Sequence, residues 1–227
     1  MIKFDIVTIF PKLFENFLNE SLLARAQKKK LIKFGVYDLR KWTTDNHKTV
    51  DDRPYGGGAG MVFKPEPIYK AVRALSSKLK VKSAKLRKDR IILLSAKGKT
   101  FTQKDARRLS KYDQLIFICG RYEGIDERVA KYIADEEISI GNYVLFGGEV
   151  PAMVIIEAVA RLIPGVVQKE ESIINESFSD KEAKIKEYAQ YTRPETIIIG
   201  GKKRSVPKVL LSGNHKKIEE WRRSGAK

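Results

Sequence analysis

Residues 115–124 read LIFICGRYEG, and residues 138–151 read ISIGNYVLFGGEVP. In each stretch a short apolar run, typical of a buried strand, leads into a glycine-rich turn. Glycine lets the backbone approach a ligand closely because no Cβ atom stands in the way. Ligands of open α/β folds bind outside the carboxyl ends of strands, so two such turns in one region predict the walls of one pocket.

Strand-like and helix-like segments alternate along the rest of the chain. Apolar runs predict strands at residues 4–10, 32–39, 91–94 and 115–119. Helical patterns cover residues 66–75 and 152–162, Pro11 suits the start of a further helix, and Thr102 can cap a helix between the last two strands. This alternation predicts an α/β fold with a mostly parallel sheet.

Two familiar nucleotide-binding signatures fail when they are checked by position. Residues 98–100 read GKT, like the end of a phosphate loop, but Leu93 stands where that motif needs its first glycine. Residues 120–124 carry glycine only at their two ends, which does not match the Gly-x-Gly-x-x-Gly pattern of dinucleotide-binding proteins. The sequence therefore argues against both kinds of nucleotide site.

The charge of the chain favours a polyanionic partner. The 227 residues include 45 Lys and Arg against 28 Asp and Glu, a formal net charge of +17. Nucleic acid is the partner that such a charge suits best, and a lysine-rich surface without a partner is the alternative. From residue 200 to 227 nine basic residues face two acidic ones, so this segment alone carries seven net positive charges.

The cysteine and histidine content and the hydropathy of the chain limit the compartment, the metal sites and the membrane association that we expect. Cys119 is the only cysteine, which excludes an intrachain disulfide and suits a reducing compartment such as the cytosol. His47 and His215 lie far apart, so a zinc site has too few ligands, whereas magnesium held by carboxylates stays open. No apolar run approaches twenty residues, and we expect neither a signal peptide nor a membrane span.

One loop near the front of the chain is unusually rich in glycine. Residues 51–61 read DDRPYGGGAGM, with four glycines in five positions behind two carboxylates and an arginine. Such a loop is suited to closing over a substrate, and a flexible surface loop is the alternative interpretation. Residues 168–180 are polar and read as a mobile linker.

Taken in order, these motifs resemble those of the bacterial tRNA (guanine-N1)-methyltransferase family. The resemblance runs from Phe4 to Arg223 and is carried by residues 51–61, 119–128, 139–152, 191–194 and 212–215. It implies a homodimer in the cytoplasm with an α/β, SPOUT-like domain at residues 1–165 whose parallel sheet contains a deep trefoil knot. It also implies a mobile linker at residues 166–178 and a small, mainly helical, basic tRNA-contacting domain at residues 179–227, which is short for the family.

The same resemblance assigns the site. S-adenosylmethionine is expected at Leu94, Ser95, Gly120, Tyr122, Glu123, Gly124, Ile140, Gly141, Tyr143, Leu145, Gly147, Gly148 and Pro151. The tRNA substrate is expected at Asp51, Arg53, Gly60, Ser177 and His215. Glu123 matches a carboxylate that the family associates with Mg²⁺.

The implied reaction methylates N1 of the guanine immediately 3′ of the anticodon. Guanine N1 carries a proton, so a general base is required, and negative charge grows on O6 as the proton leaves. Arg161 matches the family's arginine that stabilises this charge. Glu176 stands where the family has its aspartate base; the extra methylene adds about 1.5 Å of reach. Asp180 is the alternative base.

Three further positions depart from the family pattern and leave alternatives open. Asn142 replaces an aspartate, Phe146 replaces a small residue between the pocket loops, and Ala96 replaces a proline. With Glu176, these departures keep two other hypotheses in play. One is a catalytically weakened tRNA-binding member of the family, and the other is a related methyltransferase that acts on another RNA position.

Overall fold

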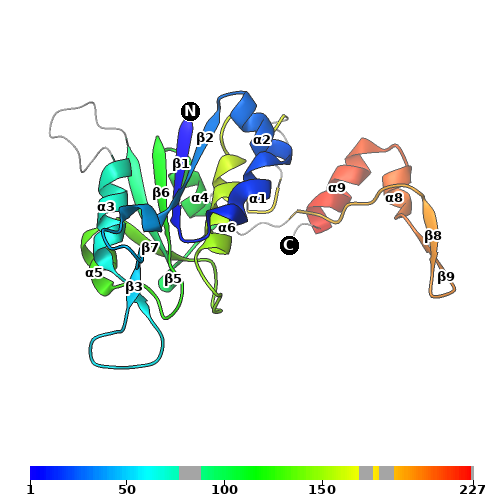
Figure 1. The fold of residues 1–227 in the computed structure, drawn as a ribbon. Coiled ribbons are helices and arrows are strands. Elements are labelled where there is room, and N and C mark those ends of the chain that lie inside the picture. The colour runs from blue at the N-terminus through cyan, green and yellow to red at the C-terminus, as the bar shows by residue number, and fades with distance from the viewer. Residues whose placement is uncertain (77–87, 169–175, 179–186, 226–227) are drawn as a thin grey trace. The chain divides into compact units, whose positions relative to one another are not determined.

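The computed structural model describes residues 1–76, 88–168, 176–178 and 187–225, and the chain divides into two units (Figure 1). The first unit is Met1–Gln168 and the second is Lys169–Lys227. Most of the predicted linker, residues 169–175, lies outside the described residues, so the linker assignment stays a prediction.

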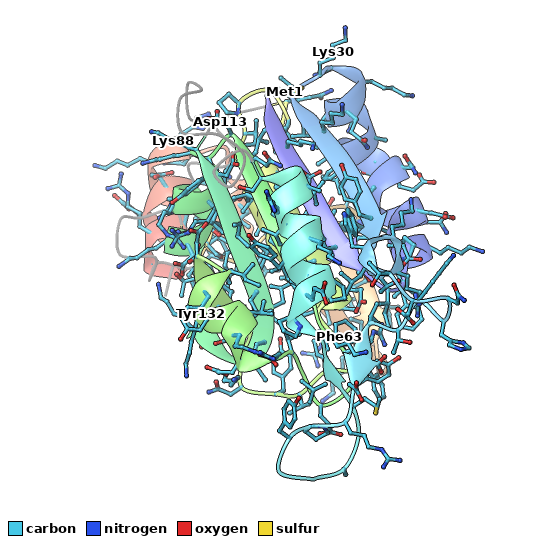
Figure 2. All side chains as sticks on the ribbon, turned by 60° about the vertical axis from the view of Figure 1, so that its left-hand side comes forward. Met1, Lys30, Phe63, Lys88, Asp113 and Tyr132 are labelled. Carbon is cyan, nitrogen blue, oxygen red and sulfur yellow. The ribbon has the colours of Figure 1, made fainter. Side chains whose placement is uncertain are left out.

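The first unit contains a five-stranded sheet in which every pair of neighbouring strands is parallel. The strand order is β2 (Ile32–Asp38), β1 (Ile2–Thr8), β6 (Gln114–Cys119), β5 (Asp89–Thr100) and β7 (Glu136–Ser139). In Figure 2 the labels of Met1, Lys88 and Asp113 mark the amino ends of β1, β5 and β6 at one edge, and Phe63 lies towards the opposite edge. The predicted parallel α/β class is confirmed.

Helices cover both faces of this sheet (Figure 1). One apolar cluster joins β1 and β6, through Phe4 and Phe117, to α1 (Glu15–Asn19), α2 (Ser21–Lys28), α4 (Gln103–Leu109) and α6 (Glu149–Ala160). The other joins Val7 and Ile116 to α3 (Pro65–Leu75) and α5 (Glu127–Tyr132). Both faces of the sheet are therefore shielded from water, as is usual for a parallel sheet.

The ends of several elements differ from the sequence prediction. β1 covers Ile2–Thr8 rather than residues 4–10, and Pro11 begins a 3₁₀ helix, Pro11–Phe14, before α1 starts. α6 starts three residues before the predicted position because Pro151 lies in its first turn, where the missing N–H has no helical partner to lose. Thr102 caps α4 as predicted, with its backbone N–H and its hydroxyl both donating to Asp105.

β5 is much longer than the apolar run that predicted it. Its register against β7 shifts, so that both Leu94 and Lys99 lie opposite Ile138, and the residues between them leave the ladder. Gly98 permits the return, because a Cβ there would lie 2.6 Å from the carbonyl carbon of Glu137. The excursion brings polar side chains to the carboxyl end of the sheet.

The described residues of the second unit form a hairpin and two helices. The hairpin joins β8 (Thr196–Ile199) to β9 (Lys202–Ser205) through Gly200 and Gly201, whose φ angles of +57° and +72° are those of a type I′ turn. α8 (Lys208–Leu211) and α9 (His215–Gly225) follow. The mainly helical expectation did not foresee this hairpin.

Candidate functional site

A cavity of about 320 Å³ lies at the carboxyl ends of β5, β6 and β7 in the first unit. This volume lies in the usual range for small-molecule sites, roughly 300–1,000 Å³. The lining comes from the excursion in β5, the two glycine-rich turns, and the facing sides of α5 and α6. The position matches the rule that ligands of open α/β sheets bind beyond the carboxyl ends of strands.

The two glycine-rich turns touch one another directly. The backbone N–H of Gly148 donates to the carbonyl of Gly120 at 2.9 Å, and an isolated bridge pairs Arg121 with Gly147. A Cβ on Gly148 would lie 2.8 Å from the Cα of Cys119, so only glycine allows this approach. The walls are therefore one packed structure rather than two independent loops.

Cys119 lies beside this contact, and its environment does not suit a reactive thiol. Its side chain is fully buried. Burial, together with the charge of Glu149, raises the pKa of the Cys119 thiol well above its usual value. The thiol stays protonated at neutral pH, which argues against a cysteine nucleophile at this site.

A charged group lines the side of the cavity near α5. The ammonium of Lys97 lies 2.6 Å from Oε2 of Glu127, and Glu137 is close enough to act on it electrostatically. The hydrogen bond to Glu127 raises the pKa of Lys97, and the charge of Glu137 adds to the effect. Sequence reasoning missed all three residues, because hydrophobic periodicity detects neither a strand excursion nor a helix of only six residues.

The front glycine-rich loop joins the cavity at its base. β3 (Asp51–Asp52) pairs with β4 (Val62–Phe63), and the carbonyl of Met61 accepts a hydrogen bond from the N–H of Glu123 at 3.1 Å. Gly60 lies against Glu123, since a Cβ on it would lie 2.8 Å from Oε1 of that carboxylate. The base of the loop that carries Asp51, Arg53 and Gly60 therefore adjoins the turn at residues 122–124.

Every residue that the sequence analysis assigned to the cofactor lines the cavity. They are Leu94, Ser95, Gly120, Tyr122, Glu123, Gly124, Ile140, Gly141, Tyr143, Leu145, Gly147, Gly148 and Pro151. Of the three further departures from the family pattern, Ala96 and Phe146 line it as well, and Phe146 is 93% exposed. Lining residues that were not predicted from the sequence are Leu93, Lys97, Arg121, Ile125, Glu127, Ala130, Glu137, Ile138, Ser139 and Val144.

The residues assigned to catalysis and to tRNA fall in both units. Arg161 is the exposed C-cap of α6 in the first unit. Glu176 and Ser177 belong to the second unit, where the hydroxyl of Ser177 accepts from the backbone N–H of Glu187 at 3.1 Å. His215 starts α9 and is exposed, and Asp180 lies outside the described residues. Their assembly into one site stays a prediction.

Neither a metal cluster nor a membrane helix occurs in the part of the chain that the structure describes. Over those residues, no three His, Cys, Asp or Glu side chains gather as metal ligands would, so Glu123 has no such set around it. Because Mg²⁺ is usually held by few carboxylates together with waters or substrate, its assignment to Glu123 stays a prediction, and we derive no step through a metal. Among the same residues, every helix is too short or too polar to cross a bilayer.

These features define an α/β protein with a preformed small-molecule cavity at the carboxyl edge of a parallel sheet. A family model described as "tRNA (Guanine-1)-methyltransferase TrmD" matches residues 2–227. The chain is 54% identical to a Dictyoglomus turgidum protein named tRNA (guanine-N(1)-)-methyltransferase, over 100% of this chain and 85% of that one. Proteins of the same name from Bacillus subtilis and Clostridioides difficile are 49% and 46% identical, each over 97% of this chain and over 85% and 90% of their own. The chain belongs to the tRNA (guanine-N1)-methyltransferase family of enzymes.

Proposed function

We propose that the protein transfers a methyl group from S-adenosylmethionine to N1 of the guanine immediately 3′ of the anticodon in tRNA. The observation that carries the proposal is the cavity, because both glycine-rich turns and the excursion in β5 line it together. The names of the relatives support the methyl acceptor, guanine N1 of tRNA.

The cavity suits a nucleoside cofactor such as S-adenosylmethionine. Its walls at Gly120, Gly141 and Gly148 present backbone rather than side chain to a ligand, and Leu94 and Pro151 add apolar surface. When bound, the cofactor supplies an activated methyl group on a sulfonium. The lining carries three carboxylates, of Glu123, Glu127 and Glu137, against the cations of Lys97 and Arg121, and this excess of one negative charge favours a cationic ligand over an anionic one.

Two side chains of this chain would perform the remaining chemistry. Glu176 takes the proton from guanine N1 as general base. Arg161 stabilises the negative charge that develops on O6, which favours the transition state over the ground state. Arg161 is exposed at the end of α6, and the other end of the same helix carries Pro151 in the cavity wall.

We further propose the trefoil knot and a homodimer. The turn at residues 140–148 returns to pack against two earlier strands. A Cβ on Gly148 would lie 3.2 Å from the Cβ of Leu94, and a knotted crossing would bring these segments into such contact.

The homodimer is supported by apolar side chains that are exposed along this turn and α6, namely Tyr143, Val144, Leu145, Phe146, Val150 and Val154. Exposed apolar patches of this kind mark interaction surfaces, and a second copy of the chain is the partner we propose.

The basic second unit is the proposed tRNA-contacting part. Lys202, Lys203 and Arg204 lie together on β9 and are exposed, and α9 adds Arg222 and Arg223 in its last turn. Cationic side chains on one small unit suit the phosphates of a tRNA, whose binding such contacts dominate.

A methylation assay tests the function. The protein is incubated with labelled S-adenosylmethionine and an unmodified tRNA that carries guanine 3′ of the anticodon, and the labelled base is identified by nuclease digestion and chromatography. Label at N1 of that guanine supports the proposal. Binding without label would favour the catalytically weakened member, and label elsewhere would favour a methyltransferase for another position.

The same assay tests the base. Glu176→Gln should lower kcat by about 10²- to 10⁴-fold, the usual contribution of a general base. Asp180→Asn is the matched control and should leave kcat near the wild-type value. Intact turnover in Glu176→Gln with turnover abolished in Asp180→Asn would transfer the role to Asp180.

A further inference from the structure

One buried carboxylate joins three distant segments beside the cavity. Glu149 is the first residue of α6 and is only 1% exposed. Its Oε1 accepts a hydrogen bond from the hydroxyl of Thr8 at 2.7 Å, and its Oε2 accepts from Nε of Arg121 at 3.0 Å. Thr8 ends β1, Arg121 belongs to the first glycine-rich turn, and Glu149 follows the second. The three segments therefore meet at a single side chain.

The ion pair lies directly over the contact between the two turns. Arg121 also bridges Gly147 through its backbone, and its guanidinium carbon is 4.6 Å from the centre of the Phe10 ring. A Cβ on Gly147 would lie 2.7 Å from both Nε of Arg121 and Oε2 of Glu149. The glycine at 147 is thus required for the ion pair as well as for the turn.

The physics of buried ion pairs suggests what this one does. Removing a carboxylate and a guanidinium from water is costly, so a buried pair contributes little net stability compared with apolar residues of similar volume. Its effect lies in selecting one arrangement of the groups that it joins. Arg121 lines the cavity, whereas Glu149 and Thr8 do not, so the carboxylate acts on a ligand only through the turns.

We propose that Glu149 is a positioning residue: with Thr8 and Arg121 it holds the two glycine-rich turns at the spacing that binds the cofactor. This inference rests on the proposed use of S-adenosylmethionine. A turn pair that is correctly spaced for only a fraction of the time binds its ligand more weakly in proportion to that fraction. Loss of the ion pair therefore raises the dissociation constant for the cofactor.

Asp5 provides a matched control on the same strand as Thr8. It is fully buried, and its carboxylate accepts from the ammonium of Lys3 at 2.8 Å and from Nε2 of Gln114 at 2.6 Å. It does not line the cavity. Asp5→Asn thus removes a buried charge from the same unit without touching either turn.

Two measurements test the inference on the full chain. Titration calorimetry with S-adenosylmethionine gives the dissociation constant, and amide hydrogen exchange without ligand reports opening at residues 120–124 and 141–148. For Glu149→Gln we expect a dissociation constant raised about tenfold, which corresponds to correct spacing for about a tenth of the time. We also expect faster exchange of the Gly148 amide. Asp5→Asn should stay within about twofold of the wild type in both.

The outcomes separate positioning from general destabilisation. Equal weakening by Glu149→Gln and Asp5→Asn, or wild-type binding and exchange in Glu149→Gln, would overturn the inference. If Glu149→Gln does not fold, Thr8→Val removes one hydroxyl alone and should raise the dissociation constant about threefold; no change would again overturn it. If the wild-type protein binds no S-adenosylmethionine, the proposed function fails, and hydrogen exchange alone still decides whether the carboxylate holds the turns together.

Discussion

The two units differ sharply in how much of their side chains they bury. In Met1–Gln168 two apolar clusters fill both faces of the sheet, with Phe4, Phe63 and Phe117 fully buried. Among the described residues of Lys169–Lys227 no side chain is buried, and Ile198 is 73% exposed. Burial of apolar surface is the main favourable term in folding. The first unit therefore has the apolar packing of a folded core, which the described residues of the second do not show.

The largest expected effect comes from removing core volume in the first unit. Phe117→Ala should lower the free energy of unfolding by about 3–5 kcal/mol, because it deletes a buried ring from the central strands. Ile198→Ala in the second unit should change it by less than about 0.5 kcal/mol, as for other exposed positions. Urea denaturation followed by circular dichroism measures both. A loss above about 2 kcal/mol for Ile198→Ala would show that the second unit has a core of its own.

A smaller effect is expected from the charges of the second unit on tRNA binding. Replacing Lys202, Lys203 and Arg204 together with alanine should weaken binding by about tenfold at moderate salt. It should also make the plot of log affinity against log salt shallower by about 2 to 3, because up to three phosphate contacts are lost. Filter binding at several salt concentrations measures the slope.

The control for this triple variant lies in the first unit. Lys28, Lys29 and Lys30 are also three consecutive exposed cations, at the end of α2. Their replacement with alanine changes the net charge equally and should alter the slope by less than one. Equal effects of the two triple variants would mean that total charge, rather than the second unit, governs binding.

The two units also differ in how much of their structure could be predicted from the sequence. Periodicity identified the strand at residues 115–119 and the parallel α/β class, because buried parallel strands read as continuous apolar runs. Glycines identified the two turns. A Cβ would collide with backbone or side chains at Gly120, Gly141, Gly147 and Gly148, and Gly124 has a positive φ of +124°. These signals are local, and the turns at residues 120–124 and 140–148 therefore appear in the cavity as expected.

What escaped prediction depends on contacts between segments far apart in the sequence. The excursion in β5 that places Lys97 in the cavity comes from its pairing with β7, which no local pattern encodes. The buried carboxylate of Glu149 looks like an ordinary acidic residue at a helix start until Thr8 and Arg121 are placed beside it. The roles of Arg161 and Glu176 rest on resemblance and stay predictions, since the two residues belong to separate units.

The smallest expected effect is on the pH dependence of the unfolding free energy. It compares a packed ion pair in the first unit with an exposed ion pair in the second. Glu136 accepts from Nε of Arg90 at 2.7 Å and from both terminal nitrogens of Arg108, at 3.0 and 2.7 Å. Burial works to raise the pKa of Glu136, but the two guanidinium groups outweigh it and leave the pKa below its usual value of 4.5. Since the folded-state pKa is the lower one, the stabilisation is complete above pH 4.5 and is lost as the pH falls through the folded-state value.

Glu136→Gln should therefore flatten the fall in unfolding free energy below about pH 5, by about 1.4 kcal/mol for each pH unit that separates the two pKa values. Glu219→Gln is the counterpart in the second unit, where Glu219 lies 3.4 Å from Arg223 and both side chains are more than half exposed. Water and salt screen that pair, so its loss should leave the pH dependence unchanged. Urea denaturation at each pH measures the two curves. Equal flattening of the curve by Glu219→Gln and Glu136→Gln would contradict the prediction. It would mean that packing does not strengthen the ion pairs of Glu136, and that the two units do not differ in how much their ion pairs contribute to stability.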